Sequence, residues 1–132
     1  KSDEWATPRA LFEGLDLEFR FTLDPAATAE NALCRKFYTK AQDGLLQDWS
    51  GERVFMNPPY SEIKAWLAKA KYESDERGAT VVALLPARTD TNWFHTYCHK
   101  KKGVEVRLLK GRLKFGNSQN SAPFPSMIVI FW

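Results

Sequence analysis

The fold and the function of this chain are best approached from the stretch Val54-Phe55-Met56-Asn57-Pro58-Pro59-Tyr60. Its first three residues are apolar and predict a short strand. The two prolines remove two backbone donors and fix two φ angles, so the turn after this strand should be stiff. Because the residue before a proline is held extended, the Asn57 side chain should leave the strand end and not enter a helix. The sequence therefore predicts a rigid corner at the carboxyl end of a strand.

The chemistry of this corner suits an exocyclic amino group. The Asn57 side-chain oxygen and the Pro58 carbonyl could each accept one N–H of such a nitrogen, and Tyr60 could stack on the attached heterocycle. Two acceptors fixed in place would stabilise positive charge that develops on the nitrogen, without a metal or a covalent nucleophile. The alternative is that the corner is only a turn between a strand and a helix.

The composition is that of one globular domain. The chain has 132 residues, of which 44% are hydrophobic and 14% aromatic, so we expect a single domain over residues 1–132. No apolar run reaches membrane-spanning length and no signal peptide is visible, so we expect no membrane partner and a cytoplasmic location. Cys34 and Cys98 lack metal-ligand spacing and should be reduced thiols.

Basic residues are concentrated in one segment. The net charge of the chain is +3, but residues 100–114 hold seven Lys or Arg against one acid, Glu105. A basic segment on a mildly acidic body is typical of an edge that binds a polyanion, although a solvated surface would show the same pattern. The seven residues are Lys100, Lys101, Lys102, Arg107, Lys110, Arg112 and Lys114.

Apolar patterns along the chain predict an α/β fold, with a mostly parallel sheet, helices on both faces and an antiparallel C-terminal strand. We expect strands at residues 19–24, 36–39, 54–56, 80–85, 104–109 and 126–132. We expect helices that begin at Pro8 with Thr7 as N-cap, at residues 28–33, from residue 61 to near Gly78, and after Asp90, which could be the N-cap of the last one. In the third helix, Lys69 and Glu73 should point away from the apolar face. The last two strands should pair at or near one edge of the sheet.

Three further patterns bear on ligands. The first strand ends at Asp24-Pro25-Ala26-Ala27, an acid and small residues at a strand end, where ligands bind in Rossmann-like units. The Thr7 hydroxyl and free N–H groups at a helix start could bind a carboxylate or another anion. His95 and His99 have helical spacing that suits a metal, but no third ligand lies nearby in the sequence, so we predict no metal site.

Read in order, these motifs resemble those of amino-methyltransferases that use S-adenosylmethionine. The chain closely resembles small phage-type DNA N6-adenine methyltransferases, from about Asp3 to Phe131. The resemblance implies a Rossmann-like methyltransferase fold, S-adenosylmethionine as cofactor and DNA as partner. It also implies methyl transfer to the N6 amino group of a flipped-out adenine, in the host cell cytoplasm if the chain is phage-encoded. The motifs are Trp5-Ala6-Thr7-Pro8, Leu23-Asp24-Pro25-Ala26-Ala27, Asp43-Gly44-Leu45, Asn57-Pro58-Pro59-Tyr60 and Gly111-Arg112-Leu113-Lys114-Phe115.

The resemblance also assigns roles to residues. The catalytic residues would be Asn57, Pro58, Pro59 and Tyr60. The cofactor would be bound by Trp5, Thr7, Pro8, Asp24, Pro25, Ala26 and Asp43, with Asp43 facing its adenine. DNA would be bound by Arg88, Lys110, Arg112, Lys114 and Phe115, and either Phe115 or Phe124 could support the flipped base. The chain departs from larger relatives in lacking glycines at residues 25–27, and no convincing acid for the cofactor ribose follows the second strand.

Two other functions remain open from the sequence. A methyltransferase of this kind could act on another planar nitrogen, in RNA adenine, at cytosine N4 or in a protein glutamine. A nucleic-acid-binding module that has lost catalysis would keep the basic edge; the absent glycines favour it, and the intact Asn57 corner argues against it. Since the chain has little room for a separate recognition domain, we expect short or lax sequence selectivity that comes from loops such as residues 111–124.

Overall fold

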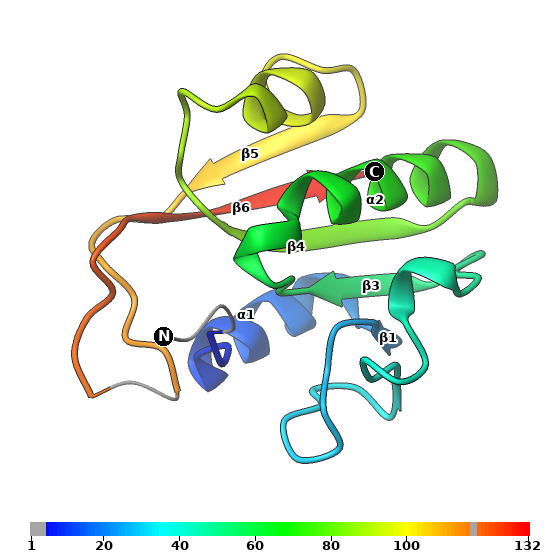
Figure 1. Ribbon diagram of the computed structural model, residues 1–132, viewed down its shortest axis with the longest axis horizontal. Helices are drawn as coiled ribbons and strands as arrows, with labels where there is room; N and C mark the ends of the chain where they lie inside the picture. The colour runs from blue at the N-terminus through cyan, green and yellow to red at the C-terminus, as the bar shows by residue number, and fades with distance from the viewer. Residues whose placement is uncertain (1–4, 117–118) are drawn as a thin grey trace.

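The computed structural model describes residues 5–116 and 119–132, which build a mixed α/β architecture on one six-stranded sheet (Figure 1). Asp3, near the expected start of the family resemblance, and residues 117–118 of the predicted loop lie outside the described residues. The strands lie in the order β2-β1-β3-β4-β6-β5. Their bounds are β1 Leu23–Asp24, β2 Lys36–Phe37, β3 Arg53–Met56, β4 Thr80–Pro86, β5 Val104–Leu108 and β6 Ser126–Phe131.

Strand pairing confirms the predicted sheet. β1 pairs in parallel with β2 and β3, and β3 pairs in parallel with β4. β6 is antiparallel to both β4 and β5, as expected for the C-terminal strand. Because both of its neighbours run against β6, β5 runs in the direction of β4. The arrowheads of β3 and β5 accordingly point the same way in Figure 1, opposite to that of β6.

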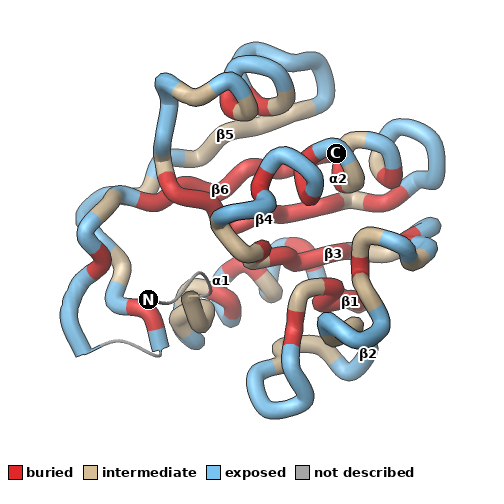
Figure 2. The backbone as a smooth tube through the Cα atoms, in the orientation of Figure 1, coloured by how far each residue is buried: buried red, intermediate tan, exposed pale blue. Residues whose placement is uncertain are grey.

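The two long helices cover opposite faces of the sheet, as predicted. They are α1 (Arg9–Phe19) and α2 (Ile63–Arg77). Side chains alternate along a strand, so Phe55 of β3 packs in the cluster that contains α1, whereas Val54 and Met56 pack in the cluster that contains α2. The buried strands form the centre of the molecule (Figure 2). Across the described parts of the chain, every helix falls short of the length and apolarity that crossing a membrane requires.

This topology gathers several loops at one edge. β3 ends just before Asn57, β4 ends just before Ala87 and Arg88, and β5 ends before the loop that starts at Leu109. Since these strands share one direction, all three loops leave the sheet at its carboxyl edge. The predicted catalytic corner and the residues that follow the other two strands therefore lie on the same side of the molecule.

The helix predicted at residues 28–33 is absent, and the segment is a turn. The Thr28 N–H donates to Asn31 Oδ1 at 2.8 Å, and the Asn31 N–H donates to Thr28 Oγ1 at 3.1 Å. These reciprocal bonds close a single turn, as they do at the start of a helix. The turn does not continue as a helix, since the Leu33 N–H donates to the Asp24 carboxylate at 3.1 Å.

The first predicted strand begins later than expected because α1 continues to Phe19. Arg20 then closes α1 in the left-handed region, and Asp16 accepts bonds from the Arg20 and Phe21 N–H groups, both at 2.8 Å. Only Leu23 and Asp24 remain to form β1. The alternating residues 19–24 were predicted as one strand, but the first two of them form the end of α1 and its C-cap.

Two predicted N-caps were wrong. α1 starts at Arg9, and Pro8 occupies the N-cap without a side-chain bond, so the Thr7 hydroxyl does not cap it. Instead of an ordinary helix after Asp90, the chain forms a short helical segment that continues as a π-helical turn at Phe94–Cys98. Thr91 Oγ1 accepts a bond from the Phe94 N–H at 3.3 Å.

Candidate active site

The Asn57 side chain is held in one orientation by the N-terminal segment. Its Nδ2 donates to the Trp5 carbonyl oxygen and to Thr7 Oγ1, the latter at 3.0 Å. A carbonyl oxygen can only accept, so the nitrogen of the amide must face Trp5 and the oxygen must face away. Asn57 Oδ1 is buried, and none of the described residues gives it a hydrogen bond. The corner thus presents one fixed acceptor that the fold leaves unused.

The two prolines turn the chain as predicted. Pro58 is buried, and Pro59 is the N-cap of a single 3₁₀ turn at Tyr60–Glu62 that leads directly into α2. The Pro59 carbonyl accepts a bond from the Glu62 N–H at 3.0 Å. Strand, corner and helix are therefore one continuous unit, and Asn57 sits at its bend.

Tyr60 lies beside Arg88 and Phe124. Its ring centroid is 5.6 Å from that of Phe124 in an edge-to-face arrangement. The Arg88 guanidinium carbon lies 6.0 Å from the Tyr60 ring and 5.9 Å from the Phe124 ring. Burial raises the pKa of Tyr60 well above its ordinary value, so the phenol stays neutral, and its hydroxyl has no hydrogen-bond partner within the described residues.

The loop after β5 packs on the segment that holds Asn57. The Trp5 ring lies 5.3 Å from both Phe115 and Phe124, and the Gly116 N–H donates to the Ala6 carbonyl at 2.8 Å. Three motifs that are distant in the sequence therefore meet at one place. Phe115, expected on the DNA-binding surface, is only 1% exposed, because it fills the space between this loop and the sheet.

The Asp43-Gly44-Leu45 motif lies against the end of β1. A Cβ added at Gly44 would come within 2.1 Å of the Pro25 carbonyl oxygen and 3.0 Å of the Trp66 ring, so no larger residue fits. Asp43 takes a positive φ of 57°, and its side chain accepts a bond from the Leu45 N–H at 3.1 Å. The close approach at Gly44 brings together two segments that were predicted to bind the cofactor.

Asp24 shapes the loop that follows β1. It is 4% exposed, and its carboxylate accepts bonds from the Leu33 N–H at 3.1 Å and the Ala26 N–H at 3.4 Å. Burial raises the pKa of Asp24 to about 6, and the two N–H bonds act in the opposite direction. The carboxylate therefore organises residues 25–33, and any effect on a ligand would pass through that loop.

The sequence analysis missed a buried ionic network that joins α2 to the segment before β3. Glu73 was expected to point away from the core but is fully buried, and it accepts bonds from the Trp49 N–H at 3.1 Å, Lys69 at 2.6 Å and Arg77 at 3.1 Å. Lys69 also lies 5.3 Å from the Trp49 ring and donates to the Gln47 carbonyl. The Lys-x₃-Glu-x₃-Arg spacing on one helix face was the available signal.

The basic segment does not form one continuous edge. Arg107 is paired with Glu18 at 2.7 Å and with Glu105 at 2.7 Å, which ties β5 to α1. The exposed lysines at residues 100–102 precede β5, at the end opposite the carboxyl edge, roughly 17 Å away along the strand. Arg88, Lys110, Arg112 and Lys114 are exposed on the loops that follow β4 and β5, at the carboxyl edge.

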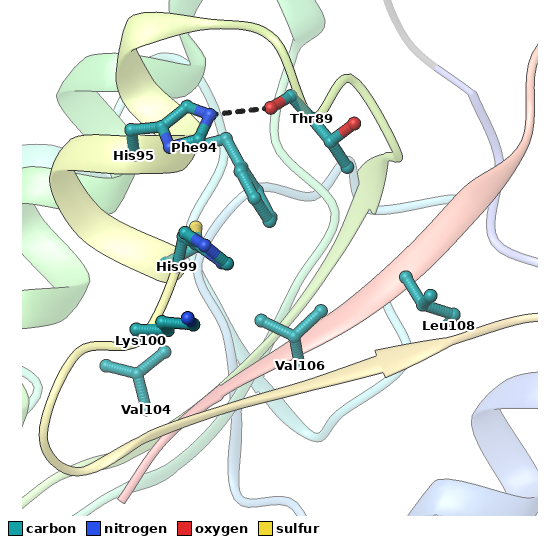
Figure 3. Close-up of a pocket in the computed structure, with 9 residues that line it drawn as sticks. Thr89, Phe94, His95, His99, Lys100, Val104, Val106 and Leu108 are labelled. Carbon is teal, nitrogen blue, oxygen red and sulfur yellow. Dashed lines mark hydrogen bonds between the residues drawn. The ribbon is translucent and has the colours of Figure 1, made fainter.

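His95 and His99 lie in a separate hollow of about 480 Å³ on the β5 side of the sheet (Figure 3). Val104, Val106 and Leu108 of β5 line it, and His95 Nε2 lies 2.8 Å from the Thr89 carbonyl oxygen. Within the described residues, no three His, Cys, Asp or Glu side chains gather closely enough to hold a metal ion. None of the predicted catalytic residues lines this hollow.

Comparison with known proteins identifies the family. Residues 1–131 match the model of the family described as DNA N-6-adenine-methyltransferase (Dam). A DNA N-6-adenine-methyltransferase of Haemophilus phage HP1 is 33% identical over 140 residues, which cover 99% of this chain and 80% of that protein. One from Escherichia phage T1 is 37% identical over 94 residues, which cover 70% of this chain and 39% of that protein. The chain therefore belongs to the DNA N-6-adenine-methyltransferase (Dam) family.

Proposed function

We propose that this chain transfers a methyl group from S-adenosylmethionine to the N6 amino group of an adenine flipped out of DNA. The observation that carries the proposal is the buried, unpaired Asn57 Oδ1, whose orientation is fixed by Trp5 and Thr7. A buried acceptor without a partner is rare in proteins, and a substrate N–H would satisfy it. The family match supports adenine in DNA as the substrate.

Asn57 and Pro58 would hold the target nitrogen. Their two oxygens would each accept one N–H and stabilise the positive charge that develops as the nitrogen lone pair attacks. When bound, S-adenosylmethionine would supply the methyl group from its sulfonium sulfur, which would leave as a neutral thioether. Once the nitrogen is cationic its extra proton leaves readily, so no strong base is required near Asn57. Tyr60 would stack on the adenine.

The residues around β1 and α1 fit the cofactor. The tight contact at Gly44 brings the loop of the half-exposed Asp43 against Pro25, and the Asp43 carboxylate would accept a bond from the adenine amino group of the cofactor. Trp5, Thr7 and Pro8 lead into the start of α1, where free N–H groups suit the methionine carboxylate. We propose a Rossmann-like arrangement, since these segments lie at the carboxyl edge, and one methyltransferase domain over residues 1–132.

DNA would lie across the carboxyl edge. Lys110, Arg112 and Lys114 would contact its phosphates, and Phe115 would support this surface from within. RNA adenine, cytosine N4 and protein glutamine are alternative substrates with a planar nitrogen, but the family match favours DNA adenine. Because phage and bacterial DNA replicate in the cytoplasm, we expect the reaction there.

The test is to incubate the protein with radiolabelled S-adenosylmethionine and unmethylated DNA, and to digest the DNA to nucleosides. We expect label in N6-methyldeoxyadenosine. Asn57→Ala should bind the cofactor normally in calorimetry but lose about 100-fold or more in turnover, the usual effect of removing one preorganised group. The matched control is Asn92→Ala, which removes an exposed amide elsewhere.

Two results would contradict the proposal. Label in another nucleoside, or none, would reject adenine methylation in DNA. Loss of cofactor binding in Asn57→Ala, with the control unchanged, would mean that the corner is structural and does not hold the target nitrogen.

A further inference from the structure

We infer that Arg88 is a positioning residue that holds a phosphate of the target nucleotide at the mouth of the base pocket. This inference rests on the proposed function and deepens it, because it separates one cation from the general DNA-binding surface. It starts from the position of Arg88, which lies on the loop after β4, next to the corner that follows β3.

The backbone fixes Arg88 at this place. The Arg88 N–H donates to the Pro86 carbonyl at 2.8 Å, and the neighbouring Ala87 N–H donates to the Pro125 carbonyl at 2.9 Å. Pro86 itself is paired with Ser126 at the start of β6. The backbone of Arg88 is therefore tied to β4 and to the residue before β6, and its side chain extends from a fixed point.

The Arg88 charge is available to an anion. The residue is exposed, and no carboxylate in the described parts of the chain forms an ion pair with it; its contacts are the Tyr60 and Phe124 rings. Arg107, by contrast, is neutralised by Glu18 and Glu105. An exposed contact between a cation and an aromatic ring is weak, so a phosphate can displace it.

The position of the target base brings a phosphate to this side chain. If Asn57 holds N6 and Tyr60 stacks on the adenine, the glycosidic bond points away from N6, and the sugar and its phosphates stay at the mouth of the pocket. The Arg88 guanidinium lies 6.0 Å from the Tyr60 ring, within side-chain reach of that mouth. Its planar fork matches phosphate oxygens, which a lysine cannot do to the same degree.

The proposed role is to favour the flipped nucleotide over the stacked one. Flipping costs unstacking energy, and a contact that forms only after the nucleotide has rotated offsets part of that cost. Lys110, Arg112 and Lys114 would instead contact phosphates of stacked and flipped DNA alike. Removing Arg88 should therefore affect base capture more than overall DNA binding.

The experiment uses a short duplex with a target adenine mapped by wild-type methylation. Flipping is followed by the fluorescence of 2-aminopurine in place of that adenine, and catalysis by kcat and KM. A second duplex carries an uncharged methylphosphonate beside the target nucleotide. The variants are Arg88→Ala, Arg88→Lys and the control Lys101→Ala, which removes an equal charge at the opposite end of β5.

We expect Arg88→Ala to lower kcat/KM about 10- to 100-fold, the range for one lost charge-assisted bond, and to abolish the fluorescence rise. Its Kd for DNA should change less than about threefold, as for loss of one phosphate contact, and Arg88→Lys should be intermediate. The methylphosphonate should slow the wild type but not slow Arg88→Ala further.

Each opposite result is decisive. Equal losses in Arg88→Ala and Lys101→Ala, or an unchanged fluorescence rise, would overturn the role of Arg88 while wild-type methylation still upheld the proposed function. A methylphosphonate effect of the same size in wild type and Arg88→Ala would show that this phosphate is not the partner. Failure of the wild type to methylate DNA adenine would overturn both.

Discussion

Asn57 Nδ2 lies 3.0 Å from Thr7 Oγ1, a contact that joins two motifs 50 residues apart. The same nitrogen also donates to the Trp5 carbonyl. With both N–H groups engaged, the amide can offer only its oxygen to a substrate. The N-terminal motif therefore sets the orientation of the Asn57 amide in the proposed catalytic corner.

Replacing Thr7 should loosen the orientation of the Asn57 amide. Thr7→Val keeps the shape of the side chain but removes the acceptor, so the Asn57 amide loses one of the two bonds that orient it. We expect the single-turnover methylation rate to fall about tenfold, the value of one hydrogen bond in the transition state. Rapid-quench kinetics would measure the rate.

Thr7→Ser is the control, because it retains the hydroxyl and should keep most of the rate. Calorimetry of S-adenosylmethionine binding separates two roles for Thr7. If Thr7→Val lowers the affinity for the cofactor but leaves the rate at saturating cofactor unchanged, the hydroxyl binds the cofactor and does not orient Asn57.

The contact between Gly44 and Pro25 should tolerate no side chain. Gly44→Ala would place a Cβ 2.1 Å from a backbone oxygen, so the two loops must separate. We expect a loss of about 2 kcal/mol or more in unfolding free energy, typical of overpacking at a rigid site, and weaker cofactor binding. Urea unfolding and calorimetry are the measurements.

Gly14→Ala is the matched control, since a Cβ at this position in α1 meets nothing within 4 Å. It should stabilise the protein by about 0.5 kcal/mol or more, because alanine is the better helix former. A neutral Gly44→Ala would show that the loops separate at no cost.

Features that depend on neighbouring residues could be predicted from the sequence, whereas features that depend on distant residues could not. The Asn57 corner was predictable because proline restricts its own backbone and that of the residue before it. The helix expected at residues 28–33 failed because the Leu33 N–H bonds to the Asp24 carboxylate, a contact that periodicity does not reveal. The basic edge was overestimated because Glu18, 89 residues from Arg107, lies beside it only after folding.

The orientation of the Asn57 amide could not be predicted either. The sequence predicted an acceptor oxygen but gave no sign that the nitrogen faces Trp5 and Thr7, since that contact depends on how α1 docks on the sheet. Likewise, Phe115 was expected among the DNA-binding residues, and its place in the core depends on packing against Trp5 that the sequence does not show.

The buried Glu73 should be more important for stability than any surface ion pair. Glu73→Gln leaves Lys69, whose side chain is 13% exposed, without its carboxylate. We expect a loss of about 3 kcal/mol in unfolding free energy, as for other broken buried pairs. The control Asp75→Asn breaks the exposed pair with Lys71 and should cost less than about 0.5 kcal/mol. Equal effects in urea unfolding would contradict this assignment.

Asp24 should make stability depend on pH. Its pKa is raised to about 6 from an ordinary value of 3.8, so the folded state binds the proton more tightly than the unfolded state. The stabilising contribution is therefore complete below about pH 4 and is lost as pH rises through about 6. We expect the stability of the wild type relative to Asp24→Asn to fall by up to about 3 kcal/mol over this window.

Urea unfolding of both proteins at a series of pH values tests this, because the variant lacks the titrating group and cancels other pH effects. A difference that stays constant, or that rises with pH, would mean that the carboxylate is stabilised in its charged form by the Leu33 and Ala26 N–H groups.

The two groups of surface cations should differ in DNA binding. Replacing Lys110, Arg112 and Lys114 with alanine should reduce the slope of log Kd against log salt by about 2 to 3, since each phosphate contact contributes about 0.9. The same substitutions at Lys100, Lys101 and Lys102 remove an equal charge at the far end of β5 and should change the slope little. Matching slopes for the two variants would place the DNA across both ends of β5.

The position of β6 has a consequence for biosynthesis. Although it comes last among the strands, it lies between β4 and β5, so β4 keeps an open edge and β5 lacks its partner strand until residues 126–131 have left the ribosome. Open strand edges invite aggregation. The bond from Ala87 to Pro125, which ties the Arg88 loop to its neighbour, also forms only at this point. The edge that carries the proposed site is thus completed only after translation of β6.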